Sequence, residues 1–408
     1  MNLASGLEAR RFPGWLVILG ALTAIGPLSI DMYLPAFAAI EHDLAAPAGK
    51  AGLTLAGFFI GMASGQLVWG PLSDRFGRKP PLYAGLALFA LASLGCALTN
   101  DITALTAWRI LQALGGSAGM VIARAVVRDR CTARESARAF STLILVMGLA
   151  PILAPIIGGW LAATLGWRAI FFLLLAFSLA CIAAIRLGLP ESHDIRHESA
   201  LNPRRILSDY AALFGSRAFI GYTLSGGLAM AGMFAYITGS PFVLIQLAGI
   251  APENFGWVFG FNALGFIAAS QINAHSLNTS APTAMLRRAL WLPGLAGLAL
   301  SILSLSLDYE HAAMLPLTLL CMFIYVASLG FIAPNSSASA LATHGQRAGT
   351  ASALMGALQF GLATLTGVGI SHLHDGSARP LALTLAACGV SAWLLHRWLV
   401  HPHDRHHG

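Results

Sequence analysis

The stretch PESHDIRHESALNPRRILSDYAALFGSR, which runs from Pro190 to Arg217, is the longest polar segment in this 408-residue chain. It separates two parts of similar length, and each part consists of long apolar runs with short polar connections. We place six runs before the segment and six after it, at roughly 14–39, 51–72, 81–99, 102–127, 137–163, 168–189, 217–246, 254–274, 285–307, 312–334, 349–372 and 380–400. The polar segment is therefore interpreted as a solvated, partly helical linker between two halves of the same kind.

The composition indicates that the runs lie in a lipid bilayer. Hydrophobic residues make up 57% of the chain and charged residues 10%, whereas a soluble domain carries about 25% charged residues. A membrane-spanning helix needs about 20 apolar residues, which each run provides. We predict an all-α integral membrane protein with twelve transmembrane helices in two six-helix bundles. The first bundle takes residues 1–189, the linker 190–216, and the second bundle 217–408 with a short His-rich tail. This architecture excludes a nucleic-acid-binding domain, despite the net charge of +7, and an enzyme domain on a single anchor.

The basic residues indicate the orientation. Of the 24 lysines and arginines, 20 fall on the side of the N-terminus and three, Lys50, Arg168 and Arg379, on the other, while Arg109 lies inside a run. Loops rich in lysine and arginine stay in the cytoplasm. We therefore expect a multi-pass protein of the bacterial inner membrane with both termini in the cytoplasm.

The loop after the second run reads GPLSDRFGRK, from Gly70 to Lys79. Its glycines permit tight turns, and we expect the Asp74 carboxylate to meet the N-terminal end of the run at 349–372. The basic residues hold the loop at the cytoplasmic surface. Every defining position of the loop signature of the major facilitator superfamily, GxLxDRxGRK, is filled, so the chain resembles that family. The resemblance implies a conformational switch made of Gly70, Asp74, Arg75, Gly77, Arg78 and Lys79.

Two further runs carry partial superfamily signatures. RILQALGG at 109–116 is similar to RxxQG, and APILAPIIGG at 150–159 is similar to GxxxGPxxGG, with alanine in place of some glycines. Small residues at this spacing let helices approach closely, and prolines add bendable points. We therefore add Pro155, Gly158 and Gly159 to the switch residues.

Four segments resemble the drug:proton antiporters of the bicyclomycin-resistance (Bcr/CflA) type. They are SIDMYLPA at 29–36, ARAVVRD at 123–129, APENFG at 251–256 and AGTAS at 348–352. This resemblance implies efflux of small, mostly apolar drugs, driven by protons, through alternating access of the two bundles. The expected partners are the drug, protons and the bilayer, and the chain is expected to be a monomer. Export of an endogenous metabolite, such as a nucleoside or amino-acid derivative, and a non-transporting sensor on the same fold are the alternatives.

Asp31 is the only acidic residue well inside a run, because Asp101 and Asp308 lie at run edges. A charge inside a membrane needs a partner or a water-filled cavity. Asp31 and Arg109 lie at similar depth, ~12 Å and ~10 Å from the outer ends of their helices, so we expect them to pair. Asp31 would carry the coupled proton, because movement of a nearby guanidinium changes the protonation of a carboxylate. A permanent ion pair that orders two helices is the alternative.

A drug cavity is expected where methionine, aromatic and amide side chains share helix faces near mid-membrane. Methionine and aromatic side chains adapt to varied apolar ligands, and amides hydrogen-bond them. The same stripes also fit an ordinary bundle core. The candidates are Tyr33, Gln112, Met120, Met230, Phe234, Tyr236, Asn262 and Gln359.

No motif predicts catalysis or a bound cofactor. The chain contains no P-loop, no Rossmann glycine pattern and no nucleophile elbow. His193 and His197 have no third ligand nearby, and we interpret the tail from His396 to Gly408 as solvated, with weak metal binding as the alternative. We expect no enzyme activity, no cofactor and no metal site.

Overall fold

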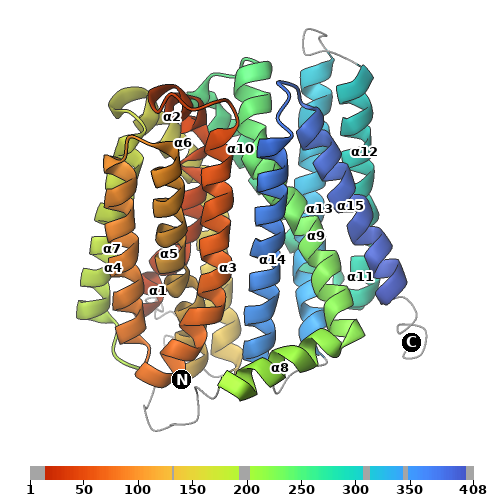
Figure 1. The fold of residues 1–408 in the computed structure, drawn as a ribbon. Coiled ribbons are helices and arrows are strands. Elements are labelled where there is room, and N and C mark those ends of the chain that lie inside the picture. The colour runs from red at the N-terminus through yellow and green to blue at the C-terminus, as the bar shows by residue number, and fades with distance from the viewer. Residues whose placement is uncertain (1–13, 131–132, 193–202, 307–312, 343–347, 401–408) are drawn as a thin grey trace, which may run out of the picture.

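Figure 1 shows a computed structural model of the chain, which describes residues 14–130, 133–192, 203–306, 313–342 and 348–400. Every regular element in these ranges is a helix. Before the linker they are α1 (Gly14–Asp31), η1 (Leu34–Ala36), α2 (Phe37–Asp43), α3 (Lys50–Phe76), α4 (Lys79–Leu98), α5 (Ile102–Arg130), α6 (Ala133–Leu165) and α7 (Arg168–Gly188). The others are α8 (Pro203–Gly215), α9 (Arg217–Pro241), η2 (Phe242–Leu247), α10 (Pro252–Ser276), α11 (Pro282–Ala289), α12 (Trp291–Ser306), α13 (Met314–Ala342), α14 (Ala348–His372) and α15 (Arg379–Leu399).

The predicted all-α membrane architecture is confirmed. Within the described residues, ten helical segments are long and apolar enough to cross a membrane. The two other predicted spans correspond to α6, with 33 residues, and α15, with 21 residues. Three predicted runs are formed by consecutive helices, namely α1–η1–α2, α9–η2 and α11–α12.

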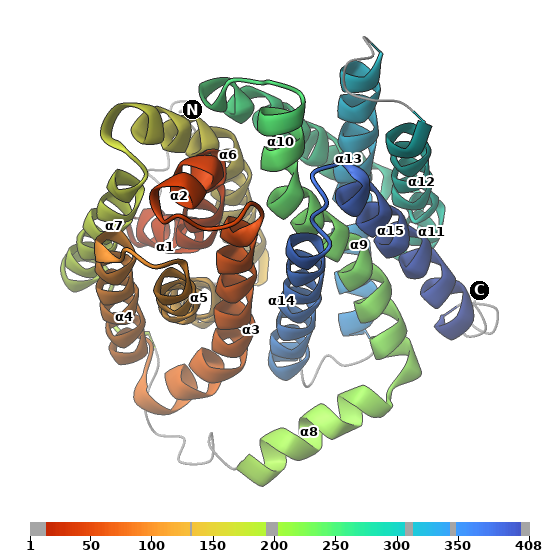
Figure 2. The ribbon, with the colours of Figure 1, turned by 45° about the horizontal axis from the view of Figure 1, so that its top comes forward.

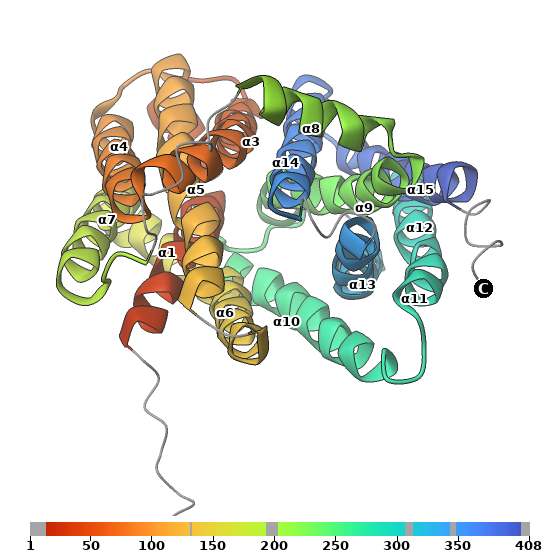
Figure 3. The same ribbon diagram turned by 90° about the horizontal axis from the view of Figure 1, so that it is seen from below.

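The helices form two groups, α1–α7 and α9–α15, that lie side by side (Figures 1 and 2). The linker helix α8 crosses one end of the molecule, where it packs against α9 and α14 (Figure 3). We call this end the α8 face and the opposite end, which carries α2, the α2 face. The pairs α3–α14 and α6–α10 make most of the contact between the groups. The boundaries of the halves at residues 189 and 217 stay a proposal.

Glycines let the two groups approach closely on the side of the α2 face. A Cβ atom at Gly52 of α3 would lie 2.6 Å from Ser371 Oγ of α14, and one at Gly256 of α10 would lie 2.7 Å from Ile156 Cγ1 of α6. Both distances are shorter than side-chain carbons tolerate, so larger residues would push the groups apart.

Helix α1 ends at Asp31 because the following sequence cannot continue it. Pro35 has no N–H group to donate to the Asp31 carbonyl, so the helical hydrogen-bond ladder stops. The chain turns through Met32 and Tyr33 into η1, whose buried residues contact α6, α9 and α10. The break leaves carbonyl groups at the end of α1 open to other donors, inside the span.

The prediction that the C-terminal tail begins at His396 was wrong. His396 lies in α15, which continues to Leu399, and its side chain is buried, with its ring 6.1 Å from that of Tyr222. The tail histidines from position 401 on, and the pair His193 and His197, lie outside the described residues.

Candidate functional site

Asp31 lies at the junction of the two helix groups. Its side chain, at the end of α1, is only 4% exposed. Tyr236 of α9, in the other group, lies within electrostatic range of the Asp31 carboxylate. Among the described residues, this carboxylate forms no ion pair and no hydrogen bond. An acidic group in this setting, inside a membrane span, is a candidate functional group.

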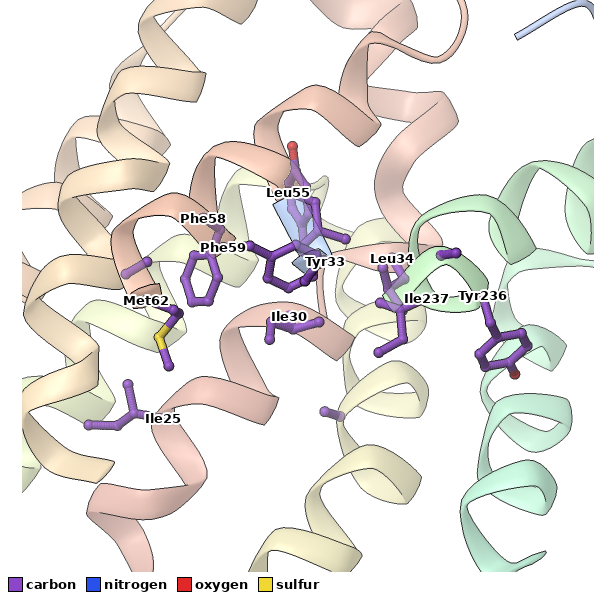
Figure 4. Packing of buried hydrophobic residues seen from close by; sticks show 14 of the residues in the cluster. Ile25, Ile30, Tyr33, Leu34, Leu55, Phe58, Phe59, Met62, Tyr236 and Ile237 are labelled. Carbon is purple, nitrogen blue, oxygen red and sulfur yellow. The ribbon is translucent and has the colours of Figure 1, made fainter. Parts of the chain in front are cut away.

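Figure 4 shows how the segment after Asp31 meets the second group. Leu34 of η1 lies beside Ile237 of α9, while Tyr33 turns back toward Phe58 and Phe59 of α3. The break in α1 thus directs neighbouring residues to different groups. A carboxylate at this position is therefore sensitive to any relative movement of the two groups.

Arg109 lies inside the N-terminal group, where its side chain is fully buried on α5. Its Nη2 donates to the Ser29 carbonyl over 3.0 Å, and its Nη1 donates to Gln112 Oε1 over 2.6 Å. The rings of Phe58 and Tyr33 lie 4.2 and 4.6 Å from the guanidinium carbon. The negative end of the α1 dipole and the faces of the two rings therefore stabilise the cation.

The expected ion pair between Asp31 and Arg109 is not formed. Arg109 binds the backbone carbonyl of Ser29 inside the N-terminal group, while Asp31 lies at the junction near Tyr236. The sequence placed the two residues at similar depth, on two different helices. Depth alone cannot show whether two side chains face each other, and Asp31, two residues after Ser29 in α1, points to a different side of that helix.

Tyr33 and Gln112, two of the expected drug contacts, use their polar groups inside the N-terminal group. Gln112 Nε2 donates to Ser93 Oγ over 2.8 Å, and the Tyr33 hydroxyl lies 2.7 Å from Thr54 Oγ1. Both side chains are fully buried. The structure therefore places them as support for Arg109 and not on a surface that a ligand reaches in this conformation. A helical stripe in the sequence does not distinguish a cavity from a neighbouring helix.

Phe234 belongs to an aromatic cluster that joins the two groups. Its ring centroid lies 4.7 Å from that of Phe59 on α3 and 5.5 Å from that of Phe360 on α14. Phe59 and Phe360 lie 6.3 Å apart. We call these three residues the junction aromatics. Sequence reasoning missed Phe59 and Phe360, because one phenylalanine in an apolar helix carries no signal of its own.

Tyr236 and Asn262 form a neutral polar pair in the C-terminal group. Asn262 Nδ2 donates to the Tyr236 hydroxyl over 2.8 Å, and the Tyr236 ring stacks on Phe259 at 5.5 Å. Both side chains are buried, each with 2% of its surface exposed. The pair links α9 to α10.

Met120, Met230 and Gln359 are partly buried. A Cβ atom at Gly26 of α1 would lie 3.1 Å from Met120 Sδ, and one at Gly227 of α9 would lie 3.8 Å from Gln359 Cγ. Met120 therefore packs on α1, while Gln359 of α14 packs on α9 near Met230. Of the eight expected drug contacts, Phe234 is itself one of the junction aromatics, and Met230 and Gln359 lie on the same helices, α9 and α14, as Phe234 and Phe360.

Arg78 organises the loop at 70–79. Its side chain is 2% exposed, its Nε donates to Asp129 Oδ2 over 2.7 Å, and its Nη1 lies 2.5 Å from Asp74 Oδ1. Burial alone would lower the pKa of Arg78, but hydrogen bonds to Asp129 and Asp74 outweigh burial and raise it. Sequence reasoning missed Glu191, whose carboxylate accepts hydrogen bonds from the backbone N–H groups of Arg78 and Lys79 at 2.9 and 3.0 Å.

The structure gives the other switch residues of the loop less defined contacts. Gly77 adopts a φ of 85°, which favours glycine, whereas Gly70 has open space around it. Arg75 is exposed, with its guanidinium 5.3 Å from the Phe76 ring. The side chains of residues 343–349 lie outside the described part, and so does the expected contact of Asp74 with the start of α14.

The glycines of α6 face both groups. A Cβ atom at Gly158 would overlap the Met32 carbonyl oxygen, and one at Gly159 would lie 3.1 Å from the Pro252 carbonyl oxygen at the start of α10. Pro155 lies inside the same helix, where it removes one backbone hydrogen bond. This part of α6 is therefore a contact between Asp31's segment and the second group.

Comparisons with known proteins agree with this arrangement. The family model of the Major Facilitator Superfamily matches residues 19–368. The chain is 36% identical over 375 residues to an uncharacterized MFS-type transporter, YdgK, of Bacillus subtilis, which covers 91% of this chain and 92% of the relative. It is 32% identical to a bicyclomycin resistance protein homolog of Haemophilus influenzae, covering 94% and 96%, and 28% identical to multidrug resistance protein D of Escherichia coli, covering 86% and 87%. The crystal structure of a D-xylose–proton symporter has the same fold, with a TM-score of 0.73 over 95% of this chain and 98% of that one, at 15% identity.

Proposed function

Since the chain belongs to the Major Facilitator Superfamily and is a multi-pass membrane transporter, we propose that it exports small, mostly apolar drugs in exchange for protons. The observation that carries this proposal is Asp31, a buried carboxylate without an ion-pair partner at the junction of the two groups. The names of the relatives, which include bicyclomycin and multidrug resistance, support the drug class.

Asp31 is the proposed proton carrier. A carboxylate that meets water in one state and a dry junction in the other gains and loses its proton as the groups move. Arg109 holds the end of α1 through Ser29 and so keeps Asp31 at the junction. In this proposal the role of Arg109 is to position the helix end and not to pair with Asp31.

The junction aromatics are the proposed start of the drug site. They bring three ring surfaces from α3, α9 and α14 together, and such surfaces suit flat apolar molecules. Met230 and Gln359 lie on two of the same helices, and the Tyr236–Asn262 pair offers polar groups between α9 and α10. A drug would separate these rings and take their place between the groups.

We propose that the α8 face is cytoplasmic, because the basic residues of the sequence concentrate there. The close contacts between the groups at Gly52, Gly159 and Gly256 lie toward the α2 face. This supports a state that is closed toward the outside of an inner membrane. Rocking of the two halves about the junction would open the α2 face and release the drug.

The proposal is tested with purified protein in proteoliposomes that enclose a pH-sensitive dye. Addition of apolar antibiotics, under an imposed pH gradient, is expected to move drug and protons in opposite directions. A parallel panel of nucleosides and amino-acid derivatives tests the metabolite alternative. Drug movement without proton movement, or proton movement with the metabolites alone, would overturn the proposal.

A further inference from the structure

We propose that the α8 face of the C-terminal group holds a binding site for an anionic phospholipid. The site consists of Arg287 and Arg288 at the end of α11, Trp291 at the start of α12, and Trp393 and Arg397 near the end of α15. We call these five residues the Arg–Trp patch. None of them takes part in the proposed drug and proton site.

The two tryptophans join the helices of the patch. Their ring centroids lie 4.5 Å apart, and the Arg397 guanidinium lies 5.8 Å from the Trp393 ring. Helices α12 and α15 are neighbours, and α11 leads into α12 through a single residue (Figure 3). Arg287 and Arg288 therefore lie about one helical turn before Trp291 in the chain.

The positive charge of the patch has no acidic counterpart in the helices that form it. Helices α11, α12, α13 and α15 contain no aspartate or glutamate. Within the described residues, Arg287, Arg288 and Arg397 form no ion pair, and all three side chains are exposed. An anion from outside the chain is the complement that such a cluster favours.

The surroundings indicate that this anion is a lipid headgroup and not a soluble phosphate. Trp291 is 50% exposed, and below it α12 presents Leu292, Leu295 and Leu298 with 40%, 59% and 45% exposure. Tryptophan prefers the level of the headgroups, and exposed leucines at greater depth suit acyl chains. The patch therefore offers one phospholipid both a charged site for its phosphate and an apolar wall for its tails.

The test compares the wild-type protein with a variant that carries R287Q, R288Q and R397Q. Binding of phosphatidylglycerol is measured by native mass spectrometry and by the rise in melting temperature of the detergent-solubilised protein, with phosphatidylcholine as the neutral lipid. We expect the wild type to bind phosphatidylglycerol more tightly than phosphatidylcholine. The triple variant should lose about tenfold or more of that preference, since each basic residue near a membrane surface contributes about fivefold.

Arg186 supplies the matched control, because it is an exposed arginine in the last turn of α7. R186Q should keep the preference for phosphatidylglycerol. A triple variant that melts like the wild type without lipid shows that it is folded, and a variant with lysine at the three positions should retain most of the binding. An unchanged preference in the triple variant, an equal loss in R186Q, or equal stabilisation of the wild type by inorganic phosphate would overturn the proposal. These measurements need no transport, so their outcome is separate from that of the proposed function.

Discussion

The N-terminal and C-terminal halves satisfy their buried polar groups by different chemistry. The N-terminal half buries charges, with Asp31 at the junction and Arg109 among carbonyl, amide and aromatic groups. The C-terminal half buries neutral pairs, such as Tyr236 with Asn262. A charge responds strongly to movement and to pH, whereas a neutral pair responds weakly. The difference suggests that proton coupling belongs to the first half and that the second half mainly recognises the drug.

The largest effect is expected from Asp31→Asn, which removes the proposed proton carrier with little change in size. We expect complete loss of export driven by a pH gradient, with normal folding and membrane insertion. Transport in proteoliposomes and size-exclusion chromatography measure these two properties.

Asn262→Ala is the matching change in the C-terminal half. It should alter which drugs are carried while export still depends on the pH gradient. If Asp31→Asn still drives uphill export, or if Asn262→Ala loses proton coupling alone, the contrast between the halves does not hold.

The second effect concerns Arg109, which joins α5 to the end of α1. Arg109→Ala leaves the Ser29 carbonyl and Gln112 Oε1 without their donor in a buried site, and each unsatisfied acceptor costs about 1–3 kcal/mol of unfolding free energy. Arg109→Lys keeps the charge but loses the planar, two-pronged geometry, so its loss should be smaller. Tyr236→Phe, which removes a neutral hydrogen bond, should cost about 1 kcal/mol. Melting temperatures of the three variants measure the order of their stabilities. An Arg109→Ala protein as stable as Tyr236→Phe would contradict the contrast between the buried charges of the N-terminal half and the neutral pairs of the C-terminal half.

The sequence was sufficient for the fold and for the depth of the charges, but not for the partners of the charges. Hydropathy and loop charge can be read from each short stretch of sequence by itself, and all twelve predicted runs correspond to helices for this reason. Partners depend on how helices are rotated against one another. Thus Asp31 and Arg109 were placed at one depth but do not pair, and Gln112 supports Arg109 inside its own group. The junction aromatics form only when α3 and α14 meet.

The third effect tests the contact between the halves. Gly256→Ala would place a Cβ atom 2.7 Å from Ile156 Cγ1 across the junction. Crowding of this kind costs about 1–3 kcal/mol, and here it acts only while the α2 face is closed. We expect export to slow by about tenfold and a cysteine at Val243, which lines a pocket at the α2 face and is only 1% exposed, to become more reactive.

Gly361→Ala in α14 is the control, because nothing lies within 4 Å of its Cβ position. It should transport at the wild-type rate. Equal slowing in both glycine variants would indicate that helix flexibility, and not closure of the α2 face, limits the rate.

The smallest effect is expected at Asp74 in the loop that the N-terminal half alone has kept. Its carboxylate pairs with Arg78 at 2.5 Å, but the Asp74 side chain is 47% exposed, whereas that of Asp129, the other partner, is 14% exposed. An exposed ion pair contributes at most about 1 kcal/mol, so Asp74→Asn should change the transport rate by no more than about fivefold. Arg78→Gln removes both pairs and should slow transport more. Drug affinity should change little in either variant, because the loop lies at the α8 face, away from the junction aromatics.

In the corresponding loop of the C-terminal half, which joins α10 to α12, the only lysine or arginine residues are Arg287 and Arg288. We therefore expect Arg287→Gln to leave the transport rate unchanged. Transport rates and equilibrium drug binding, measured on the three variants together, decide the matter: if Asp74→Asn weakens drug binding as much as it slows transport, the loop shapes the drug site and does not control the switch between states.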